Sequence, residues 1–357
     1  MHSLTSKQDL CAWLNQFSHS HLIADWANQP HLVTESGPKA YQITFPFAAH
    51  GLIKELDAWI QNQLQKGEVS RFDYTISVKT KTLATPVAKT IAGVKNIIAV
   101  TSAKGGVGKS TTAVNLALAL AHSGAKVGLL DADVYGPSVP LMLGTEGQKP
   151  LVADDRWMKP VEAHGLYTNS IGYLVDKAEA AIWRGPMASK ALEQLLNETQ
   201  WPDLDYLVID MPPGTGDIQL TLAQQIPVTG AVIVTTPQDL ALADARKGAA
   251  MFEKVDVPVV GLIENMSYHI CSHCGTKEHI FGNGGAVLLA GEYGLALLAQ
   301  IPLHIAMRED IDAGIPTVAR RPESEHAGYY LDLAERISSI LFWQGTVKPD
   351  AIGITLV

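Results

Sequence analysis

The ten residues SAKGGVGKST, Ser102 to Thr111, decide the fold of this chain. They follow an almost wholly apolar run, NIIAVTS, and precede a stretch with helical spacing, so they join a strand to a helix. The glycines let backbone N–H groups converge on an anion, and the positive end of the helix dipole points at the same place. The pattern therefore predicts a phosphate-binding loop. Its expected binding residues are Gly105, Gly106, Val107, Gly108, Lys109, Ser110 and Thr111.

Two side chains of the loop complete this chemistry. Lys109 would reach the β and γ phosphates of a nucleotide, and the Ser110 hydroxyl would be a ligand of Mg²⁺. The loop departs from the pattern GxxxxGK[ST], because Ala103 stands where the first glycine is expected, and Lys104 adds a second lysine. The alternative is a glycine-rich turn with incidental lysines, and the strand before the loop and the helix after it argue against that.

Around this loop, apolar strands alternate with helices. The expected strands are NIIAVTS, KVGLLDAD, DYLVIDM, GAVIVTT and VPVVGLIEN. The expected helices cover 110–122, 188–198, 218–225, 240–254, 284–293 and 324–341. This alternation predicts an α/β fold of the P-loop NTPase class, with a mostly parallel sheet covered by helices on both faces. Ligands of such sheets bind beyond the carboxyl ends of the strands.

The chain divides into four expected parts. Residues 1–80 form a small α/β domain, with helices at 9–17 and 52–64 and strands at 40–45 and 71–78. Residues 81–95 have no clear period and form a linker, 96–343 form the P-loop domain, and 344–357 form a C-terminal tail.

The bulk properties exclude several classes of function. The net charge of the 357 residues is −9 and no segment clusters Lys and Arg, so we expect neither nucleic acid nor a membrane surface as a partner. We see no export signal and no apolar run of the roughly 18 residues that cross a membrane. Three cysteines without an export signal indicate a reducing compartment, and we expect the cytoplasm.

Carboxylates follow two of the other expected strands. Asp131 and Asp133 lie in DADVYGPS, and Asp210 and Gly214 lie in DMPPGTGD. Carboxylates at such positions hold Mg²⁺ through bound water, and a glycine N–H can bind the γ-phosphate. Each aspartate alone could equally be a helix cap or a turn residue. Together with the phosphate loop, they indicate a nucleotide site.

These motifs carry a family resemblance. The loop KGGVGKST, with its extra Lys104, resembles the deviant Walker A motif of MinD/ParA-type ATPases. From about Val94 to Trp343 the chain resembles the Mrp/ApbC family of iron–sulfur cluster carrier ATPases within that group. The segments that carry this resemblance are DADVYGPS, WRGPMASKAL, DMPPGTGD, TTPQ and ENMSYHICSHCG. The first 80 residues resemble, more weakly, the small iron–sulfur assembly domain that often precedes the ATPase.

The resemblance implies roles for single residues. Lys104 would cross a dimer interface to the partner's nucleotide, and Asp133 would position the attacking water. Asp131 would hold a magnesium-bound water, and Asp210 is the Walker B position. Asn265 would read the adenine edge. The implied cofactors are ATP and Mg²⁺. In this group ATP controls the geometry of a dimer, and we expect slow turnover.

Two cysteines of the segment HICSHCG, Cys271 and Cys274, are the remaining candidates for chemistry. A 4Fe–4S cluster is usually held by four thiolates. One chain supplies two of them here, and a twofold dimer would supply four. The resemblance therefore implies a labile 4Fe–4S cluster that is shared across a homodimer.

Other interpretations of this segment stay open. The histidines at 269, 273 and 279 make a Cys/His zinc site chemically reasonable. A redox-active CxxC is less consistent with the sequence, because such a pair normally begins a helix in a thioredoxin-like unit. Cys11 lies on a helical pattern beside Trp13 and Leu14, and we expect it to be a small core residue.

We expect an ATP-binding and ATP-hydrolysing homodimer that transfers its cluster to apo-proteins, with a cluster assembly scaffold as a possible donor. The alternative is a MinD/ParA-like positioning or regulatory ATPase with a structural zinc clip. A positioning ATPase would need a basic amphipathic tail, whereas the helix YYLDLAERISSILFW carries two acids and one Arg. A nitrogenase-type reductase would carry cysteines after DADVYGPS and DMPPGTGD, and none follows there.

Overall fold

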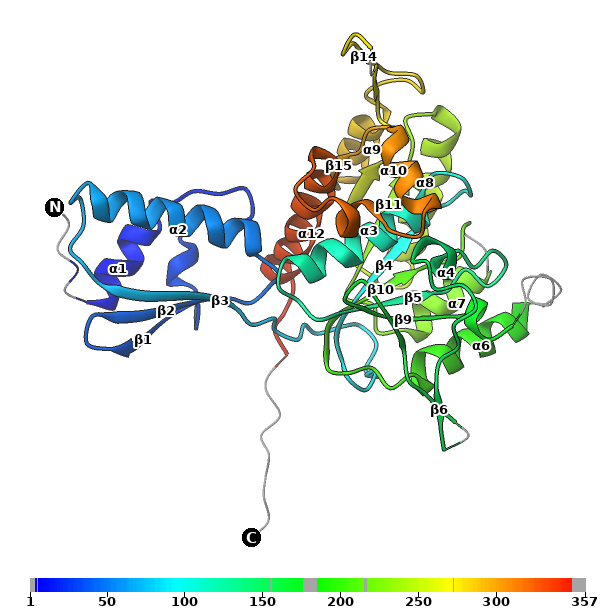
Figure 1. The fold of residues 1–357 in the computed structure, drawn as a ribbon, viewed down its shortest axis with the longest axis horizontal. Helices are drawn as coiled ribbons and strands as arrows, with labels where there is room; N and C mark the ends of the chain where they lie inside the picture. Colours follow the sequence, from blue (N-terminus) through cyan, green and yellow to red (C-terminus); the bar gives the residue numbers. More distant parts are fainter. Residues whose placement is uncertain are drawn as a thin grey trace.

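The computed structural model describes residues 4, 6–154, 156–175, 185–214, 217–271 and 273–348. They form a small N-terminal unit and a larger domain, which meet at the long helix α12, Glu325–Gln344 (Figure 1). The motif residues Trp183 and Arg184 lie outside the described residues, as do 349–357 of the expected tail. Within the described part, no helix is long and apolar enough to cross a membrane.

The N-terminal unit is a three-stranded sheet with both of its α-helices on one side (Figure 1). Its elements are α1 (Lys7–Leu14), η1 (Trp26–Asn28), β1 (Val33–Gly37), β2 (Ala40–Phe45), α2 (His50–Gln65) and β3 (Asp73–Val78). The first helix begins earlier than predicted because Ser6 and Asp9 form a capping box. β1 escaped prediction because most of its residues are polar and exposed.

The larger domain contains the predicted sheet. The strand order is β15-β12-β11-β4-β10-β5-β9-β8, and every neighbouring pair is parallel except β8 with β9. Its strands are β4 (Val94–Thr101), β5 (Val127–Asp131), β8 (Val161–Ala163), β9 (Leu166–Ser170), β10 (Leu204–Asp210), β11 (Gly230–Thr235), β12 (Val259–Glu264) and β15 (Ala296–Gln300). β8, β9 and β15 were not predicted. β15 and β8 are the edge strands of the sheet, and β9 lies next to β8.

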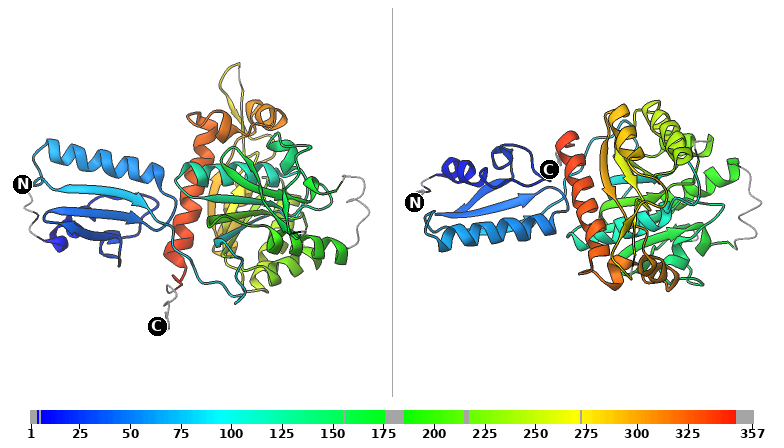
Figure 2. Two further views of the ribbon diagram at one scale, coloured as in Figure 1. Left: turned by 60° about the horizontal axis from the view of Figure 1, so that its bottom comes forward. Right: turned by 90° about the horizontal axis from the view of Figure 1, so that it is seen from above.

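Helices cover both faces of this sheet, as predicted (Figure 2). The helices are α3 (Lys109–His122), α4 (Val139–Met142), α6 (Gly185–Glu198), α7 (Asp217–Gln225), α8 (Asp239–Glu253), α9 (Gly285–Tyr293), α10 (Ile305–Asp312), α11 (Thr317–Arg320) and α12. Residues Ile98 and Val100 of β4 pack on the side of α3 and α12. Residues Ile97 and Ala99 pack on the side of α6, α7 and α8. This alternation divides the side chains of β4 between the two covered faces of the sheet. The carboxyl end of β4 leads directly into the phosphate loop.

Helix α12 belongs to the cores of both units. Phe342 and Trp343 pack against the aromatic core of the N-terminal unit, with ring centroids 5.8 and 5.7 Å from that of Phe47. The Glu335 carboxylate accepts hydrogen bonds from the backbone N–H groups of Gly51 (2.6 Å) and Leu52 (3.1 Å), which begin α2. The small unit is therefore anchored on the larger domain by both apolar packing and a charged helix cap.

The expected linker and the start of the expected tail pair with each other. Ala84 donates its N–H to the Thr346 carbonyl at 2.7 Å, and Lys348 donates to the Thr82 carbonyl at 2.9 Å. Leu83 and Val347 form an antiparallel bridge between them. The linker between the two units is thus hydrogen-bonded to the segment that follows α12, the last helix of the larger domain.

The contact between the two units should weaken at alkaline pH. His21 has a side chain 3% exposed, with Nε2 3.2 Å from an Asp332 oxygen and Nδ1 3.8 Å from a Glu335 oxygen. Burial lowers the pKa of His21, but the two carboxylates outweigh it and raise this pKa from 6.5 to about 9. A raised pKa means that the stabilisation is complete below about pH 6.5 and is lost as the pH rises through about 9.

When the pH rises from 7 to 9.5, we therefore expect the thermal unfolding midpoint of the wild type to fall by more than the midpoint of His21→Gln falls. The exposed residue His273 offers a control, since His273→Gln should follow the wild type. Parallel curves for wild type and His21→Gln would contradict this assignment.

Candidate nucleotide and cysteine sites

The phosphate loop lies between β4 and α3, where the sequence places it. Gly106 and Gly108 have φ angles of +84° and +82°, in the left-handed region that favours glycine. Lys104, Gly105 and Gly106 are exposed, so that side of the loop is open to a ligand. The loop opens directly onto the first turn of α3, whose N-terminal N–H groups complete an anion site.

Asn265, which follows β12, touches the loop. Its Nδ2 donates a hydrogen bond to the Val107 carbonyl at 2.8 Å, and the residue is 7% exposed. The same amide fills the space that a side chain on Gly108 would need, since a Cβ there would collide with Nδ2. Gly108 is therefore required both by its backbone angle and by this close approach.

Gly108→Ala should lower the stability of the nucleotide-free chain. A left-handed φ in a residue with a Cβ costs about 1–3 kcal/mol, and the clash with Asn265 adds to it. Gly105→Ala is the matched control, because Gly105 has an ordinary φ and nothing within 4 Å of its built Cβ. Denaturant unfolding measures both variants. Equal stability would contradict the loop geometry.

The carboxylates of the neighbouring strands meet beside this loop. Asp131 and Asp210 end β5 and β10 and are direct partners in the parallel register. Asp131 is fully buried, and its oxygens accept hydrogen bonds from the backbone N–H of Ser138 (3.1 Å) and the hydroxyl of Ser170 (2.9 Å). Burial, and after it the neighbouring Asp210 charge, raise the pKa of Asp131. These side chains thus form a buried pair of carboxyl groups beside the phosphate loop.

Lys109 neutralises part of the negative charge of these carboxylates. Its Nζ donates a hydrogen bond to Asp210 and lies 3.3 Å from the Ser110 hydroxyl and 3.8 Å from an Asp133 oxygen. The residue is only 6% exposed. Burial raises the pKa of Asp133, and the positive charge of Lys109 acts against that shift. The structure thus brings together the lysine, the hydroxyl and the carboxylates that the sequence singled out separately.

The donor set suits Mg²⁺. The second oxygen of Asp210, Oδ2, is buried and has no hydrogen-bond partner among the described residues. A buried carboxylate oxygen without a donor is costly, and a cation or its bound water would satisfy it. The Ser110 hydroxyl reaches the same lysine, and carboxylate and hydroxyl oxygens are the ligands Mg²⁺ prefers.

Two residues after β10 shape the opposite side of the loop. Gly214, with φ +103°, donates its N–H to the Ser102 carbonyl at 2.9 Å, so this N–H binds the loop itself. Gln219 of α7 donates to the Thr101 hydroxyl and to the Pro212 carbonyl, and its own oxygen has no hydrogen-bond partner in the part of the chain that the structure describes. Sequence reasoning missed Gln219. Gln219 is one of several polar residues of α7, DIQLTLAQQ, so the sequence carried no signal that set it apart.

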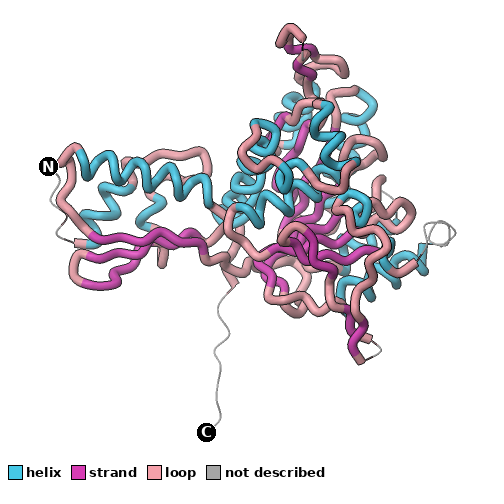
Figure 3. The backbone as a smooth tube through the Cα atoms, in the orientation of Figure 1, coloured by secondary structure: helices cyan, strands magenta, loops and turns pink. Residues whose placement is uncertain are grey.

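The cysteine pair lies on a hairpin that projects from the domain (Figures 1 and 3). Its strands are β13 (His269–Ile270) and β14 (Lys277–Glu278), which pair antiparallel. Cys271 is half-buried and Cys274 is exposed, and both are free thiols. Hydrogen bonds with the hydroxyl and backbone of Thr276 lower the pKa of Cys274. A stabilised thiolate at an exposed tip is well placed to bind a soft metal.

No complete metal site forms within the described part of this chain. No three His, Cys, Asp or Glu side chains gather there in a way that could hold an ion. His269 and His279 instead direct Nδ1 at the carbonyls of Leu303 and Ser267, each at 3.2 Å. A Cys/His zinc site contained in one chain is thus not formed by these residues. Cys11 is 3% exposed in the core of the N-terminal unit, as predicted.

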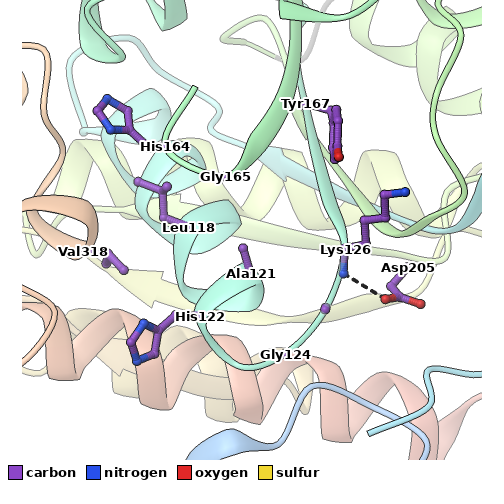
Figure 4. Close-up of a pocket in the computed structure, with 11 residues that line it drawn as sticks. Leu118, Ala121, His122, Gly124, Lys126, His164, Gly165, Tyr167, Asp205 and Val318 are labelled. Atoms are coloured by element: carbon purple, nitrogen blue, oxygen red, sulfur yellow. Dashed lines mark hydrogen bonds between the residues drawn. The ribbon is translucent and has the colours of Figure 1, made fainter. Parts of the chain in front are cut away.

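A separate cavity of about 700 Å³ lies at the other end of α3 (Figure 4). Lys126, His164, Tyr167 and Asp205 are among its lining residues, and the Lys126 N–H donates to Asp205 at 2.8 Å. Because α3 begins at the phosphate loop and ends at His122, this cavity lies a whole helix away from the loop. It takes no part in the nucleotide site.

Comparison with known proteins identifies the family of this chain. Residues 93–338 match the family model described as the ParA family, NUBPL iron-transfer P-loop NTPase. The chain is 59% identical over 318 residues to the iron-sulfur cluster carrier protein of Escherichia coli K12, covering 88% of this chain and 86% of that protein. It is 52% identical over 254 residues to the iron-sulfur cluster transfer protein NUBPL of Mus musculus, covering 71% and 79% respectively.

Solved structures resemble the larger domain. A nucleotide-binding protein of Archaeoglobus fulgidus, solved with ADP, is 37% identical with a TM-score of 0.58, covering 67% of this chain and 93% of that one. The cell division ATPase MinD of Pyrococcus furiosus is 25% identical with a TM-score of 0.52, covering 68% and 98%. Both likenesses agree with the predicted P-loop fold.

Proposed function

Because this chain belongs to the ParA-type iron-transfer P-loop NTPases, we propose that it is an iron–sulfur cluster carrier that binds a labile 4Fe–4S cluster and transfers it to apo-proteins. The observation that carries this proposal is the pair of free thiols on a projecting hairpin, the half-buried Cys271 and the exposed Cys274. Two thiolates alone leave a cluster half-ligated, so the cargo needs a second source of thiolates.

A second copy of the chain is the simplest source. A twofold axis beside the hairpin would bring four cysteines together, two from each subunit. The exposure of the hairpin makes such an approach sterically possible. A cluster held in this way at a subunit boundary can be released when the two hairpins part, which suits a carrier.

ATP is the proposed substrate of the loop. Lys109 would leave its carboxylate partners for the β and γ phosphates, and Ser110 with Asp210 would hold Mg²⁺. The ion neutralises phosphate charge when it is bound. Asp131 would hold a magnesium-bound water, and Asp133 would orient the water that attacks the γ-phosphate. Phosphoryl transfer needs these positions and charges more than covalent chemistry, so the enzyme is a slow ATPase in this proposal.

Three further roles are proposed on the family resemblance. Lys104 is exposed and free to reach a partner subunit's nucleotide. Asn265 would read the adenine edge from its place beside Val107. The N–H of Gly214 would turn from Ser102 to the γ-phosphate. Each of these roles requires a local rearrangement or a second subunit.

The proposed partners follow from the cargo. Apo iron–sulfur proteins are the recipients and an assembly scaffold is a possible donor, in the reducing cytoplasm. The N-terminal unit has one buried thiol, Cys11, so we propose that it docks a partner or client rather than a metal.

The alternative of a positioning ATPase is less consistent with the structure. Such a protein needs a free basic amphipathic helix. Helix α12 is instead packed between the two cores, and its Arg336 donates to the Leu298 carbonyl at 2.8 Å.

Cluster transfer tests the proposal. The chain is reconstituted without oxygen, separated from free iron and sulfide, and mixed with an apo-enzyme that needs a 4Fe–4S cluster. We expect the enzyme to become active at a rate that an iron chelator does not suppress. Activation that the chelator abolishes would indicate free iron, and would contradict carrier function.

A further inference from the structure

A continuous set of contacts joins the phosphate loop to the base of the cysteine hairpin. Asn265 binds the Val107 carbonyl inside the loop, at 2.8 Å. Two residues later, the Ser267 carbonyl faces His279 Nδ1 at 3.2 Å, and His279 follows the second strand of the hairpin. The base of the hairpin, Ser267 with His279, is thus separated from the loop contact by Met266 alone.

Glu264 holds this segment in place. It is the last residue of β12 and is fully buried. Its carboxylate accepts hydrogen bonds from the Ser267 hydroxyl (2.5 Å), from the Gln300 amide (2.8 Å) and from the Ala286 N–H (3.3 Å). A buried carboxylate keeps such donors because their loss would leave its charge unpaired. The Ser267 hydroxyl is therefore fixed to the sheet.

The residue between the two contacts has little freedom. Met266 has a φ of +55°, a left-handed angle that is unfavourable for a side chain of this kind. Ser267 also donates its N–H to Ile301 at 2.9 Å, and Asn265 donates its N–H to Thr235 at 2.8 Å. The turn is thus strained in its middle and hydrogen-bonded at both ends.

We infer that Ser267 is a positioning residue that couples the occupancy of the phosphate loop to the cysteine hairpin. A nucleotide that moves Val107 or draws Asn265 toward its base pulls on this turn. The bond between the Ser267 hydroxyl and Glu264 keeps the turn rigid, so the shift passes through the Ser267 carbonyl to His279 at the base of the hairpin. Coupling between two sites is reciprocal, so cluster binding changes nucleotide affinity by the same factor. As a mechanism of cluster release, this inference rests on the proposed function.

The test uses the metal-free chain, so that it does not depend on a cluster. The alkylation rates of Cys271 and Cys274 by iodoacetamide are measured with and without the Mg²⁺ complex of a non-hydrolysable ATP analogue. In the wild type we expect the analogue to change the rate at one or both thiols by about fivefold or more. In Ser267→Ala we expect a change of less than about twofold, with analogue affinity within about twofold of wild type.

Three further variants make the result specific. Ser267→Thr keeps the hydroxyl and should restore the wild-type change. Ser339→Ala removes a similarly buried hydroxyl, at 2% exposure, whose hydrogen bond to the Arg336 carbonyl lies within α12, so this variant should behave as wild type. Gln300→Ala removes a second donor to Glu264 and should weaken the change even if Ser267→Ala does not fold.

An unchanged alkylation rate in the wild type would overturn the inference, as would a full wild-type response in Ser267→Ala. Because no cluster enters the assay, either outcome is separable from a failure of cluster carriage. If the nucleotide changes the reactivity of the thiols but the chain never binds iron, the proposed function is contradicted and this inference is still supported.

Discussion

Lys109→Ala should reduce ATP hydrolysis by about a hundredfold or more, the usual loss when a group that stabilises the transition state is removed. The Nζ group is the only described cation bound to Asp210, and it would also bind the β and γ phosphates. Without it, the developing charge on the transferred phosphate loses a partner that the protein has already oriented. Steady-state phosphate release measures the effect.

The structure adds a second consequence of this change. Asp210 is fully buried, and removing one partner of a buried pair costs about 3–5 kcal/mol. Lys109→Ala should therefore also unfold at a lower temperature than the wild type. Circular dichroism shows whether the fold is kept. Lys126→Ala is a suitable control, because Lys126 precedes β5 at the other end of α3. Unchanged turnover in Lys109→Ala would exclude the loop as the hydrolytic site.

Cys271→Ala and Cys274→Ala should each abolish cluster binding and leave nucleotide binding within about twofold of wild type. Loss of one thiol per chain removes two of the four thiolates of the shared site, and two ligands do not hold a 4Fe–4S cluster. The hairpin projects away from the sheet, so either change should leave the P-loop geometry intact. Iron content after anaerobic reconstitution and titration with a fluorescent ATP analogue measure the two sites separately.

Cys11→Ala supplies the matched control. Cys11 is the third thiol of the chain, but it is buried in the N-terminal core. Cys11→Ala should lower the stability of the fold somewhat and leave the iron content after reconstitution unchanged. Full iron content in Cys271→Ala or Cys274→Ala would contradict the shared site.

The sequence predicted those parts of the site that lie within single segments. The glycine loop between an apolar strand and a helix is local chemistry, so its position was right. Asp131 and Asp210 could be placed together because the carboxyl ends of parallel strands meet at one edge of a sheet, and the register confirms that they are partners.

The features of the site and the fold that could not be predicted depend on contacts between segments far apart in the sequence. The Asn265 amide reaches Val107 across 158 positions of the chain, and no periodicity predicts such a pair. Phe342 and Trp343 belong to a helix of the larger domain yet pack in the small core. The strands β8, β9 and β15 have only three to five residues each, too few for a period to stand out in the sequence.

The most direct test of the account is the analysis of iron, sulfide and zinc per chain, together with the molecular mass, on protein purified and reconstituted without oxygen. The account predicts about four irons and four sulfides per dimer, absent from Cys271→Ala. Zinc without sulfide, or a full cluster on a monomer, would contradict it. The cysteines would then be a structural clip in the first case, or would have ligands outside the described residues in the second.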